Sequence, residues 1–370
     1  MESTYIAQRL KSIEASGIRR IWQMAATMKN PVNFSIGAPD FATPQEVKAA
    51  AIRAIKEDRN GYTVTAGLEE LRHDLAEQIQ TEFGWSNPAV VVTSGLSGAL
   101  LLALLATVNA GDEVLIPDPY FVSYRQLVNL LGGKCAFVDT YPDFSLPPRE
   151  IGNCITRKSK LLIVNSPANP TGSVYTEQQL KDTARLAGEN KLLVLSDEIY
   201  RDFSYDAPAA SIGKFYENTL VMRGFSKSYA VPGWRLGYVA APEHLRELLE
   251  AMATLQQYTF VCAPHPFQLA ARQALKCDIS QHINDYRRKR DLIYEGLKDS
   301  FELTKPQGAF YAFVKAPTVK ATEFVERAIK NHVLVIPGTV FSERDSHFRI
   351  SYATSDEQIR LGVDRLCKMV

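Results

Sequence analysis

The feature of this sequence that most constrains its fold is a series of short apolar runs, rich in β-branched residues, that alternate with amphipathic stretches such as 176–189. The runs show no polar alternation, so both faces of each strand should be buried, as in a mostly parallel sheet covered by helices. The pattern therefore predicts a three-layer α/β domain over residues 41–260. Its strands are expected at 90–93, 113–117, 135–139, 161–165, 192–196, 219–224 and 235–240.

The C-terminal third of the chain follows a different pattern. Helical periodicity covers about residues 264–300, an apolar run follows at 309–316, and another helix is expected near 321–331. These elements predict a smaller α+β domain made of residues 261–370 together with N-terminal residues 1–40. Because no flexible linker separates the two parts, we expect them to share a large interface.

Composition argues against several classes of function. The 370 residues carry a formal net charge of +1, which favours neither nucleic acid nor a strongly charged partner. The longest apolar run, Ala99 to Val108, is too short to cross a membrane and fits a buried helix. Five widely spaced cysteines without a C-x-x-C pair predict reduced thiols. The sequence shows no cluster of metal-ligating residues, so we expect no metal site. With no secretory signal in the N-terminal sequence, we expect a cytoplasmic protein.

Polar and aromatic residues follow five of the predicted strands at the point where each strand ends. These segments are S-G-L-S at 94–97, D-P-Y-F at 118–121, S-P-A-N-P-T-G at 166–172, D-E-I-Y at 197–200 and F-S-K at 225–227. Open parallel sheets bind ligands beyond the carboxyl ends of their strands. The five segments therefore predict one site that combines an anion-binding turn, an aromatic ring, an amide, an acid with a phenol, and an amine.

Each of these residues, taken alone, has a plainer structural explanation. Gly95 could belong to a helix start, Phe121 to the core, Asn169 to a turn, and Asp197 to a helix cap. Lys227 alone would be a solvated surface lysine. However, the residues that flank it are apolar, and a carboxylate at the end of a buried strand needs a partner. The coincidence of five such strand ends favours a single functional site.

The same residues resemble a known family, the class I/II aminotransferases of the pyridoxal-phosphate fold type I, and in particular its aspartate/aromatic branch. The main string is G-F-S-K-S-Y-A-V-P-G-W-R-L-G-Y at 224–238. The supporting motifs occur in the family's order and cover nearly the whole chain; they lie at 36–44, 61–72, 165–172, 196–200 and 348–353.

The resemblance implies that the chain binds pyridoxal 5′-phosphate at these strand ends. Lys227 would hold the cofactor as a Schiff base and then move the substrate's Cα proton, which suits an amine of lowered pKa. Asp197 would pair with the pyridine nitrogen and keep it protonated. Asn169 and Tyr200 would donate hydrogen bonds to the cofactor's 3′ oxygen. Lys227, Asp197 and Tyr200 would thus be the catalytic residues.

The resemblance also implies how the cofactor's phosphate and ring are held. Arg235 would bind the phosphate with its planar guanidinium, and Phe121 would stack on the pyridine ring. Two positions depart from the family's pattern. The hydroxyl residue often found three positions before the lysine is Gly224 here, and the stacking residue is often Trp or Tyr. The remaining phosphate ligands implied by the resemblance are Gly95, Leu96, Ser97 and Ser226.

For the substrate, the resemblance implies that Arg349 binds the α-carboxylate, with Asn169 and the backbone near Gly37 completing the site. Tyr62 would reach the phosphate of a neighbouring subunit, which predicts a homodimer. The expected reaction is ping-pong transfer of an amino group from an L-amino acid to a 2-oxo acid, such as 2-oxoglutarate. The aromatic, neutral stretch 256–260 favours aromatic or aliphatic amino acids over aspartate.

Three other functions are weighed against this one. A C–S β-lyase would use the same cofactor residues, so the cofactor motifs do not separate it from an aminotransferase. A non-catalytic regulatory domain of the same fold is disfavoured because no DNA-binding segment or basic patch accompanies it. A nicotinamide dehydrogenase is disfavoured because the turn after the first strand reads S-G-L-S-G-A rather than G-x-G-x-x-G.

Overall fold

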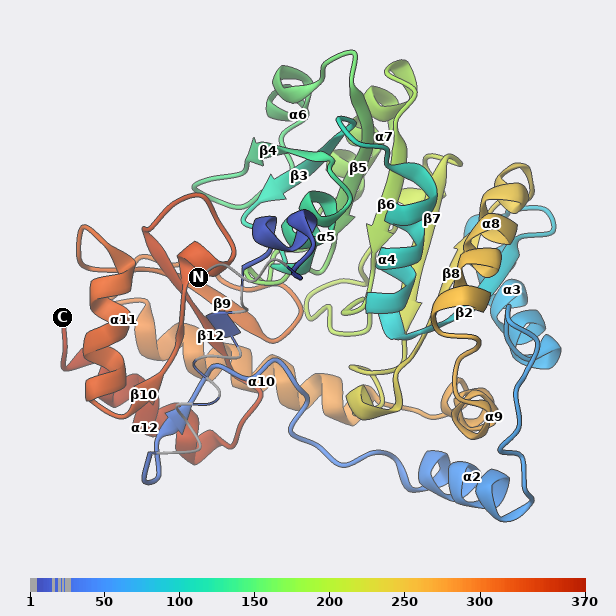
Figure 1. Cartoon of the computed structure of the whole chain (residues 1–370). Coiled ribbons are helices and arrows are strands. Elements are labelled where there is room, and N and C mark those ends of the chain that lie inside the picture. The colour runs from blue at the N-terminus through green and yellow to red at the C-terminus, as the bar shows by residue number, and fades with distance from the viewer. Residues whose placement is uncertain (1–4, 15–16, 19–20, 22, 24–27) are drawn as a thin grey trace.

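The computed structural model describes residues 5–14, 17–18, 21, 23 and 28–370, and its main feature is a seven-stranded sheet (Figure 1). All seven predicted apolar runs are strands of this sheet, in the order β2-β8-β7-β6-β5-β3-β4. The strands are β2 (Ala89–Ser94), β3 (Glu113–Asp118), β4 (Lys134–Asp139), β5 (Ser159–Asn165), β6 (Leu193–Asp197), β7 (Thr219–Gly224) and β8 (Leu236–Ala241).

The direction of the strands confirms the prediction of a mostly parallel sheet. β4, β3, β5, β6 and β7 are parallel in succession. β8 alone runs in reverse, because it pairs antiparallel with both β7 and β2. β2 therefore points the same way as the parallel strands. As a result, the carboxyl ends of β2, β3, β5, β6 and β7 meet at one edge of the sheet, as the sequence predicts.

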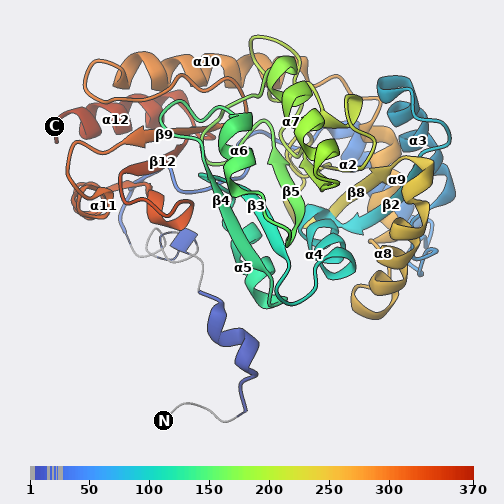
Figure 2. The same cartoon turned by 90° about the horizontal axis from the view of Figure 1, so that it is seen from above.

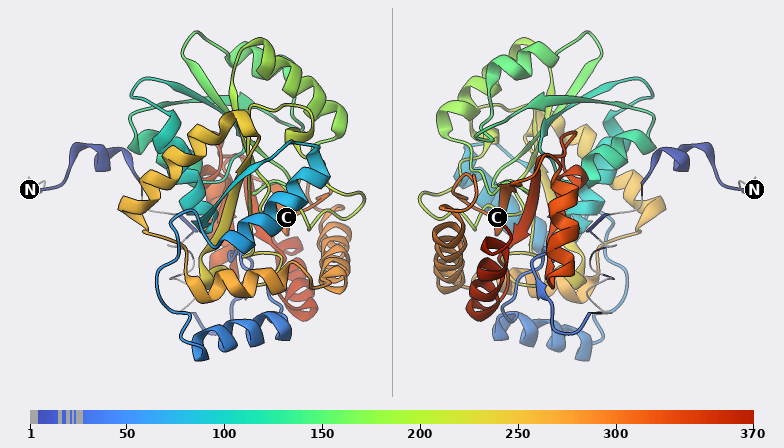
Figure 3. Two further views of the ribbon diagram at one scale, coloured as in Figure 1. Left: turned by 90° about the vertical axis from the view of Figure 1, so that its right-hand side faces the viewer. Right: turned by 90° about the vertical axis from the view of Figure 1, so that its left-hand side faces the viewer.

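Helices cover both faces of the sheet and give the expected three layers (Figures 2 and 3). On β5, Ile163 packs into the core on one face and Leu162 into the core on the other. Residues buried alternately on two faces account for apolar runs without polar alternation. One face carries α4 (Gly95–Thr107), α5 (Ser123–Leu130) and α8 (Arg246–Thr259), and the other carries α3 (Glu69–Phe83), α6 (Pro148–Cys154) and α7 (Glu177–Glu189).

The longest apolar run of the sequence forms most of α4, which confirms the prediction of a buried helix. Leu102 and Leu104 are fully buried in it, whereas Leu105 is 38% exposed. The helix begins at Gly95, directly after β2, so its first turn lies at the carboxyl edge of the sheet. Among the described residues, no helix has the length and apolar character needed to cross a membrane.

The smaller part of the chain is built on a three-stranded antiparallel sheet, ordered β11-β12-β9. The helical patterns predicted over about residues 264–300 form two helices. The break occurs where the Asp278 carboxylate accepts a hydrogen bond from the Ser280 backbone N–H at 2.9 Å, a local bond that competes with continuation of the helix. The elements are β9 (Tyr311–Lys315), β11 (Ile336–Pro337), β12 (His347–Ser351), α9 (His265–Ala274), α10 (Ser280–Leu297), α11 (Ala321–Lys330) and α12 (Asp356–Cys367).

The packing of α9 bears on where the two parts divide. The boundary predicted at residue 260 assigns α9 to the smaller part. However, Ala270, Ala271 and Ala274 share an apolar cluster with Leu71 of α3 and with α2 (Gln45–Lys56) (Figure 1). We therefore propose that the large part extends through α9 and that the smaller part begins with α10.

The N-terminal residues contact both parts of the protein. β1 (Val32–Asn33) pairs in parallel with β10 (Val333–Leu334), which lies in the C-terminal third of the chain. Further upstream, the Glu14 backbone N–H donates to the Gln126 side chain of α5 at 3.1 Å. Glu14 thus lies against the large part, near the edge where the five carboxyl ends meet. Several residues of the predicted segment 1–40 lie outside the described residues.

The burial of α4 predicts that its two faces respond differently to truncation. Leu102→Ala should lower the free energy of unfolding by about 2–5 kcal/mol, because it removes a fully buried side chain and leaves a cavity. Leu105→Ala is the matched control on the exposed side and should cost less than about 1 kcal/mol. Urea denaturation of both variants measures the difference, and equal losses would contradict the assigned packing.

Candidate active site

A cavity of about 760 Å³ lies where the carboxyl edge of the large sheet faces β9 and β12 of the smaller part. Gly95 lies beside it, whereas Tyr62 does not line it and is 85% exposed on the surface. The cavity brings together most of the predicted site residues, namely Gly37, Leu96, Ser97, Phe121, Asn169, Asp197, Tyr200, Ser226, Lys227, Arg235 and Arg349.

Lys227 lies in the turn that follows β7, and its side chain points into this cavity. Its Nζ donates to the Gly37 carbonyl oxygen at 2.5 Å and lies 5.7 Å from the centre of the Tyr200 ring. Burial lowers the pKa of Lys227 to about 8, and the positive charges of Arg349 and Arg235 act in the same direction. About a tenth of the amine is therefore neutral at pH 7, far more than for an ordinary lysine, and a neutral amine can act as a nucleophile or a base.

Asp197 is the last residue of β6 and is buried. Its Oδ2 accepts a hydrogen bond from the Tyr124 hydroxyl at 2.6 Å, and its Oδ1 accepts one from the Ile199 backbone N–H at 3.2 Å. Burial raises the pKa of Asp197 to about 6, while these two hydrogen bonds and the charge of Lys227 oppose the rise. Above that pH the carboxylate is ionised, so it can hold a protonated ring nitrogen.

Two asparagines connect the end of β5 to this acid. Asn165 Nδ2 donates to the Asp197 carbonyl oxygen at 3.0 Å, and Asn165 Oδ1 accepts from the Asn169 backbone N–H at 2.9 Å. The side chain of Asn169 is thereby fixed at the cavity wall, where its Oδ1 accepts from Arg349 at 3.1 Å. Its amide nitrogen remains available as a hydrogen-bond donor to a ligand.

Arg349 lies on β12 and is fully buried, which lowers its pKa but leaves a permanent positive charge. Its guanidinium carbon lies 4.6 Å from the ring centres of both Tyr311 and Phe341, so two aromatic faces enclose it. One terminal nitrogen donates to the Ser35 carbonyl oxygen at 2.8 Å, while the buried Nε atom has no partner among the described residues. Within the same described part of the chain, no carboxylate pairs with this cation, so a carboxylate ligand would satisfy both its charge and its free donor.

The turn between β2 and α4 suits an anion. Gly95 has a φ of 65°, and a side chain there would lie 2.6 Å from an Arg235 nitrogen, so the guanidinium packs directly against the backbone. No side chain caps the start of α4, whose free N–H groups and dipole attract negative charge. Ser97 and Ser226 line the cavity near this turn.

Gly224 has a packing explanation. A Cβ atom at this position would lie 3.0 Å from the Ile199 side chain and 3.3 Å from the Leu236 carbonyl oxygen. The tight space between β7 and β8 therefore favours glycine at this position, where the resemblance described above led us to expect a hydroxyl residue.

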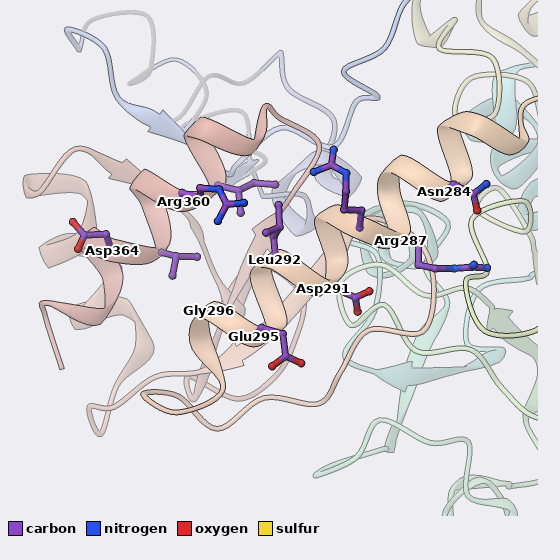
Figure 4. Close-up of a pocket in the computed structure, with 11 residues that line it drawn as sticks. Asn284, Arg287, Asp291, Leu292, Glu295, Gly296, Arg360 and Asp364 are labelled. Atoms are coloured by element: carbon purple, nitrogen blue, oxygen red, sulfur yellow. The ribbon is translucent and has the colours of Figure 1, made fainter.

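A second groove, of about 840 Å³, lies between α10 and α12 on the smaller part (Figure 4). Side chains of both charges line it, including Arg287, Glu295 and Arg360. Asp291 in this groove is already paired with Lys305 at 3.0 Å. None of the predicted site residues lies there, and the chemistry described above points to the cavity at the sheet edge.

Some residues of the cavity were not anticipated from the sequence. Tyr124 comes three residues after Phe121, at the start of α5 and just beyond the strand-end segment 118–121, so a weak signal for it existed. Tyr311 of the cavity, and Phe341, which packs against Arg349, belong to apolar segments that look like core, and nothing in their sequence separates them from it. From the neutral stretch 256–260, Phe260 lines the cavity.

The fold and this cavity define an enzyme centred on a buried lysine, and comparison with known proteins identifies its family. The family described as aminotransferase class I and II matches residues 29–366. The chain is 38% identical to a probable aspartate aminotransferase of Methanocaldococcus jannaschii, over 96% of each chain. It is 35% identical to aromatic-amino-acid aminotransferase 2 of Thermococcus litoralis, over 99% of this chain and 98% of the relative.

Solved structures agree with this result. The aspartate aminotransferase from Thermus thermophilus with maleate matches at a TM-score of 0.93 and 34% identity, over 100% of both chains. The chain therefore belongs to the class I and II aminotransferases, and it transfers amino groups. The predicted family and fold are confirmed, and the comparisons do not favour a C–S lyase.

The hydrogen bond from Tyr124 predicts a pH effect. Tyr124→Phe removes a donor that lowers the pKa of Asp197, so this pKa should rise above about 6. The carboxylate then needs a higher pH to ionise, and the acid limb of the kcat/KM profile should move to higher pH, with activity recovering above pH 8.

Tyr175→Phe is the matched control, because Tyr175 is a buried neighbouring tyrosine outside the cavity lining. Its pH profile should stay at the wild-type position. An acid limb that does not move in Tyr124→Phe would contradict the proposed effect on Asp197.

Proposed function

We propose that the cavity binds pyridoxal 5′-phosphate and that the enzyme passes an amino group from an L-amino acid through this cofactor to a 2-oxo acid, in two half-reactions. The observation that carries the proposal is the position of Lys227. Its amine, with a pKa lowered to about 8, lies in one cavity with the buried acid Asp197 and with the arginines Arg235 and Arg349. The resemblance to the family suggests 2-oxoglutarate as the acceptor.

The residues present fit this cofactor. A phosphate fits the turn at Gly95, where Arg235 and the start of α4 supply positive charge. A pyridine nitrogen fits opposite Asp197, a buried carboxylate with no cation bonded to it. Asn169 and Tyr200 offer donors for a ring oxygen between them, and Phe121 lines the cavity as a stacking surface.

When bound, pyridoxal phosphate supplies an electron sink that stabilises negative charge at the substrate's Cα. In this proposal, the ionised Asp197 keeps the ring nitrogen protonated. Arg349 binds the substrate's α-carboxylate through its free donor edge and fixes the orientation of the Cα–H bond. Lys227, once released from the cofactor, accepts the Cα proton on its Nζ and delivers it again within the cavity.

Assembly and location are also proposed. We infer a homodimer in which Tyr62 reaches the partner's phosphate site, supported by the high exposure of Tyr62, Val64 and Tyr258. A cytoplasmic location is supported by five free thiols, which are typical of reducing compartments.

Replacing the lysine tests the proposal. Lys227→Ala should abolish the visible absorbance of lysine-bound pyridoxal phosphate and reduce transamination by several orders of magnitude, because both the covalent anchor and the proton carrier are lost. Lys214→Ala, which changes an exposed lysine away from the cavity, should leave both unchanged. Wild-type absorbance in the Lys227→Ala protein would refute the assignment.

The outer wall of the cavity predicts which amino donors react. Ile13, Ile18, Leu101, Leu127 and Phe260 line it, so an apolar side chain would be buried there without an unpaired charge. We expect phenylalanine or leucine to exceed aspartate in kcat/KM by roughly 10-fold or more. Half-reactions with single amino acids measure this ratio, and a clear preference for aspartate would contradict the prediction.

A further inference from the structure

The structure assigns a positioning role to Tyr311, which orients the hydroxyl of Tyr200 and holds the guanidinium of Arg349 at the same time. This inference rests on the proposed function, because it concerns how Tyr200 donates to the cofactor's ring oxygen and how Arg349 binds the substrate's carboxylate. Tyr311 is the first residue of β9 and is 1% exposed. It therefore reaches the cavity from the smaller part, whereas Tyr200 follows β6 in the large part.

The first contact is between two hydroxyl groups. The Tyr311 and Tyr200 oxygens lie 2.8 Å apart, so one of them donates to the other. A tyrosine hydroxyl has one hydrogen to donate. If Tyr311 donates, the hydrogen of Tyr200 stays free to point at a ring oxygen of the cofactor. If Tyr200 donated instead, it would have none left for the cofactor.

The surroundings favour Tyr311 as the donor. The guanidinium of Arg349 lies against the Tyr311 ring and lowers the pKa of its hydroxyl, although burial still keeps that pKa above its usual value. Burial raises the pKa of Tyr200 well above its usual value; the neighbouring Tyr311 adds to this rise, and the charge of Arg349 only partly opposes it. The more acidic hydroxyl is the stronger donor, and chained hydrogen bonds reinforce one another. The resulting order is Tyr311 to Tyr200 to the cofactor's oxygen.

The second contact is with the substrate-binding arginine. The guanidinium carbon of Arg349 lies over the Tyr311 ring and over the Phe341 ring, 4.6 Å from each ring centre. The two rings restrict the orientation of the guanidinium plane, whose N–H groups would bind a carboxylate. In addition, a Cβ atom at Gly37 would lie 2.4 Å from the Tyr311 hydroxyl, so this backbone, whose carbonyl accepts from Lys227, rests against the same residue.

The two contacts use different atoms of Tyr311, so they can be separated experimentally. Tyr311→Phe deletes the hydroxyl and keeps the ring, whereas Tyr311→Leu deletes both. Tyr352→Phe is the matched control. It removes a hydroxyl from a fully buried tyrosine of the same core cluster, which donates to the Ala309 carbonyl at 3.3 Å and does not line the cavity.

The main readout is the pH titration of the absorbance of lysine-bound pyridoxal phosphate. A weaker hydrogen bond from Tyr200 leaves more negative charge on the ring oxygen. The nitrogen that joins Lys227 to the cofactor then keeps its proton to higher pH. In Tyr311→Phe the midpoint should therefore rise by roughly one pH unit, the equivalent of one hydrogen bond. kcat should fall about 10-fold while KM for the amino acid stays within about twofold, because the ring on Arg349 is intact.

Tyr311→Leu should show the same shift of the midpoint. In addition, KM should rise by about 10-fold, because Arg349 loses one of the two aromatic rings that pack against its guanidinium. Should this variant fail to fold, the titration of Tyr311→Phe decides the question alone. An unchanged midpoint in Tyr311→Phe, or an equal shift in Tyr352→Phe, would overturn the inference while leaving the proposed function intact. A wild-type protein without the absorbance of lysine-bound cofactor would overturn both.

Discussion

The structure is organised around one constraint, the burial of ionisable side chains in a single cavity between two parts of the chain. Asp197, Lys227 and Arg349 each lose hydration there, and a buried charge without partners is costly. The protein offsets the cost with fixed dipoles and rings rather than with ion pairs. Tyr124 donates to the acid, the Gly37 carbonyl accepts from the amine, and aromatic faces enclose the guanidinium. This leaves the charges available to a cofactor and a substrate.

A second buried network lies beneath the cavity and supports the strands that carry these groups. Arg223 of β7 donates to Glu198, which follows β6, at 2.8 Å, and to Glu82 of α3 at 2.8 and 2.9 Å. Glu198 also accepts from Ser196 at 2.7 Å. These bonds tie the ends of β6 and β7 to each other, so that Asp197 and Lys227 emerge at a fixed separation. Arg223 thus lies four residues before Lys227 yet serves the framework rather than the chemistry.

Much of the fold and half of the cavity follow from local pattern. Uninterrupted apolar runs mark strands buried on both faces, and the carboxyl ends of parallel strands must meet at one edge, which is why Asp197, Asn169 and Lys227 could be assigned together. Tyr311 and Tyr124 could not be assigned in this way. A buried tyrosine looks the same in the sequence whether its hydroxyl faces a catalytic group or the core, since only the neighbours across the fold distinguish the two.

The sequence by itself determined the succession of strands and helices along the chain, the side chains at each strand end, and the family to which the chain belongs. These features depend on residues close together along the chain. Only the tertiary structure decided which side chains from distant segments contact one another. It reversed β8 within the sheet, packed α9 against α2 and α3, and brought Tyr311 from the far end of the chain onto Tyr200 and Arg349. Such contacts join distant segments, and their geometry is set by packing, which no local pattern records.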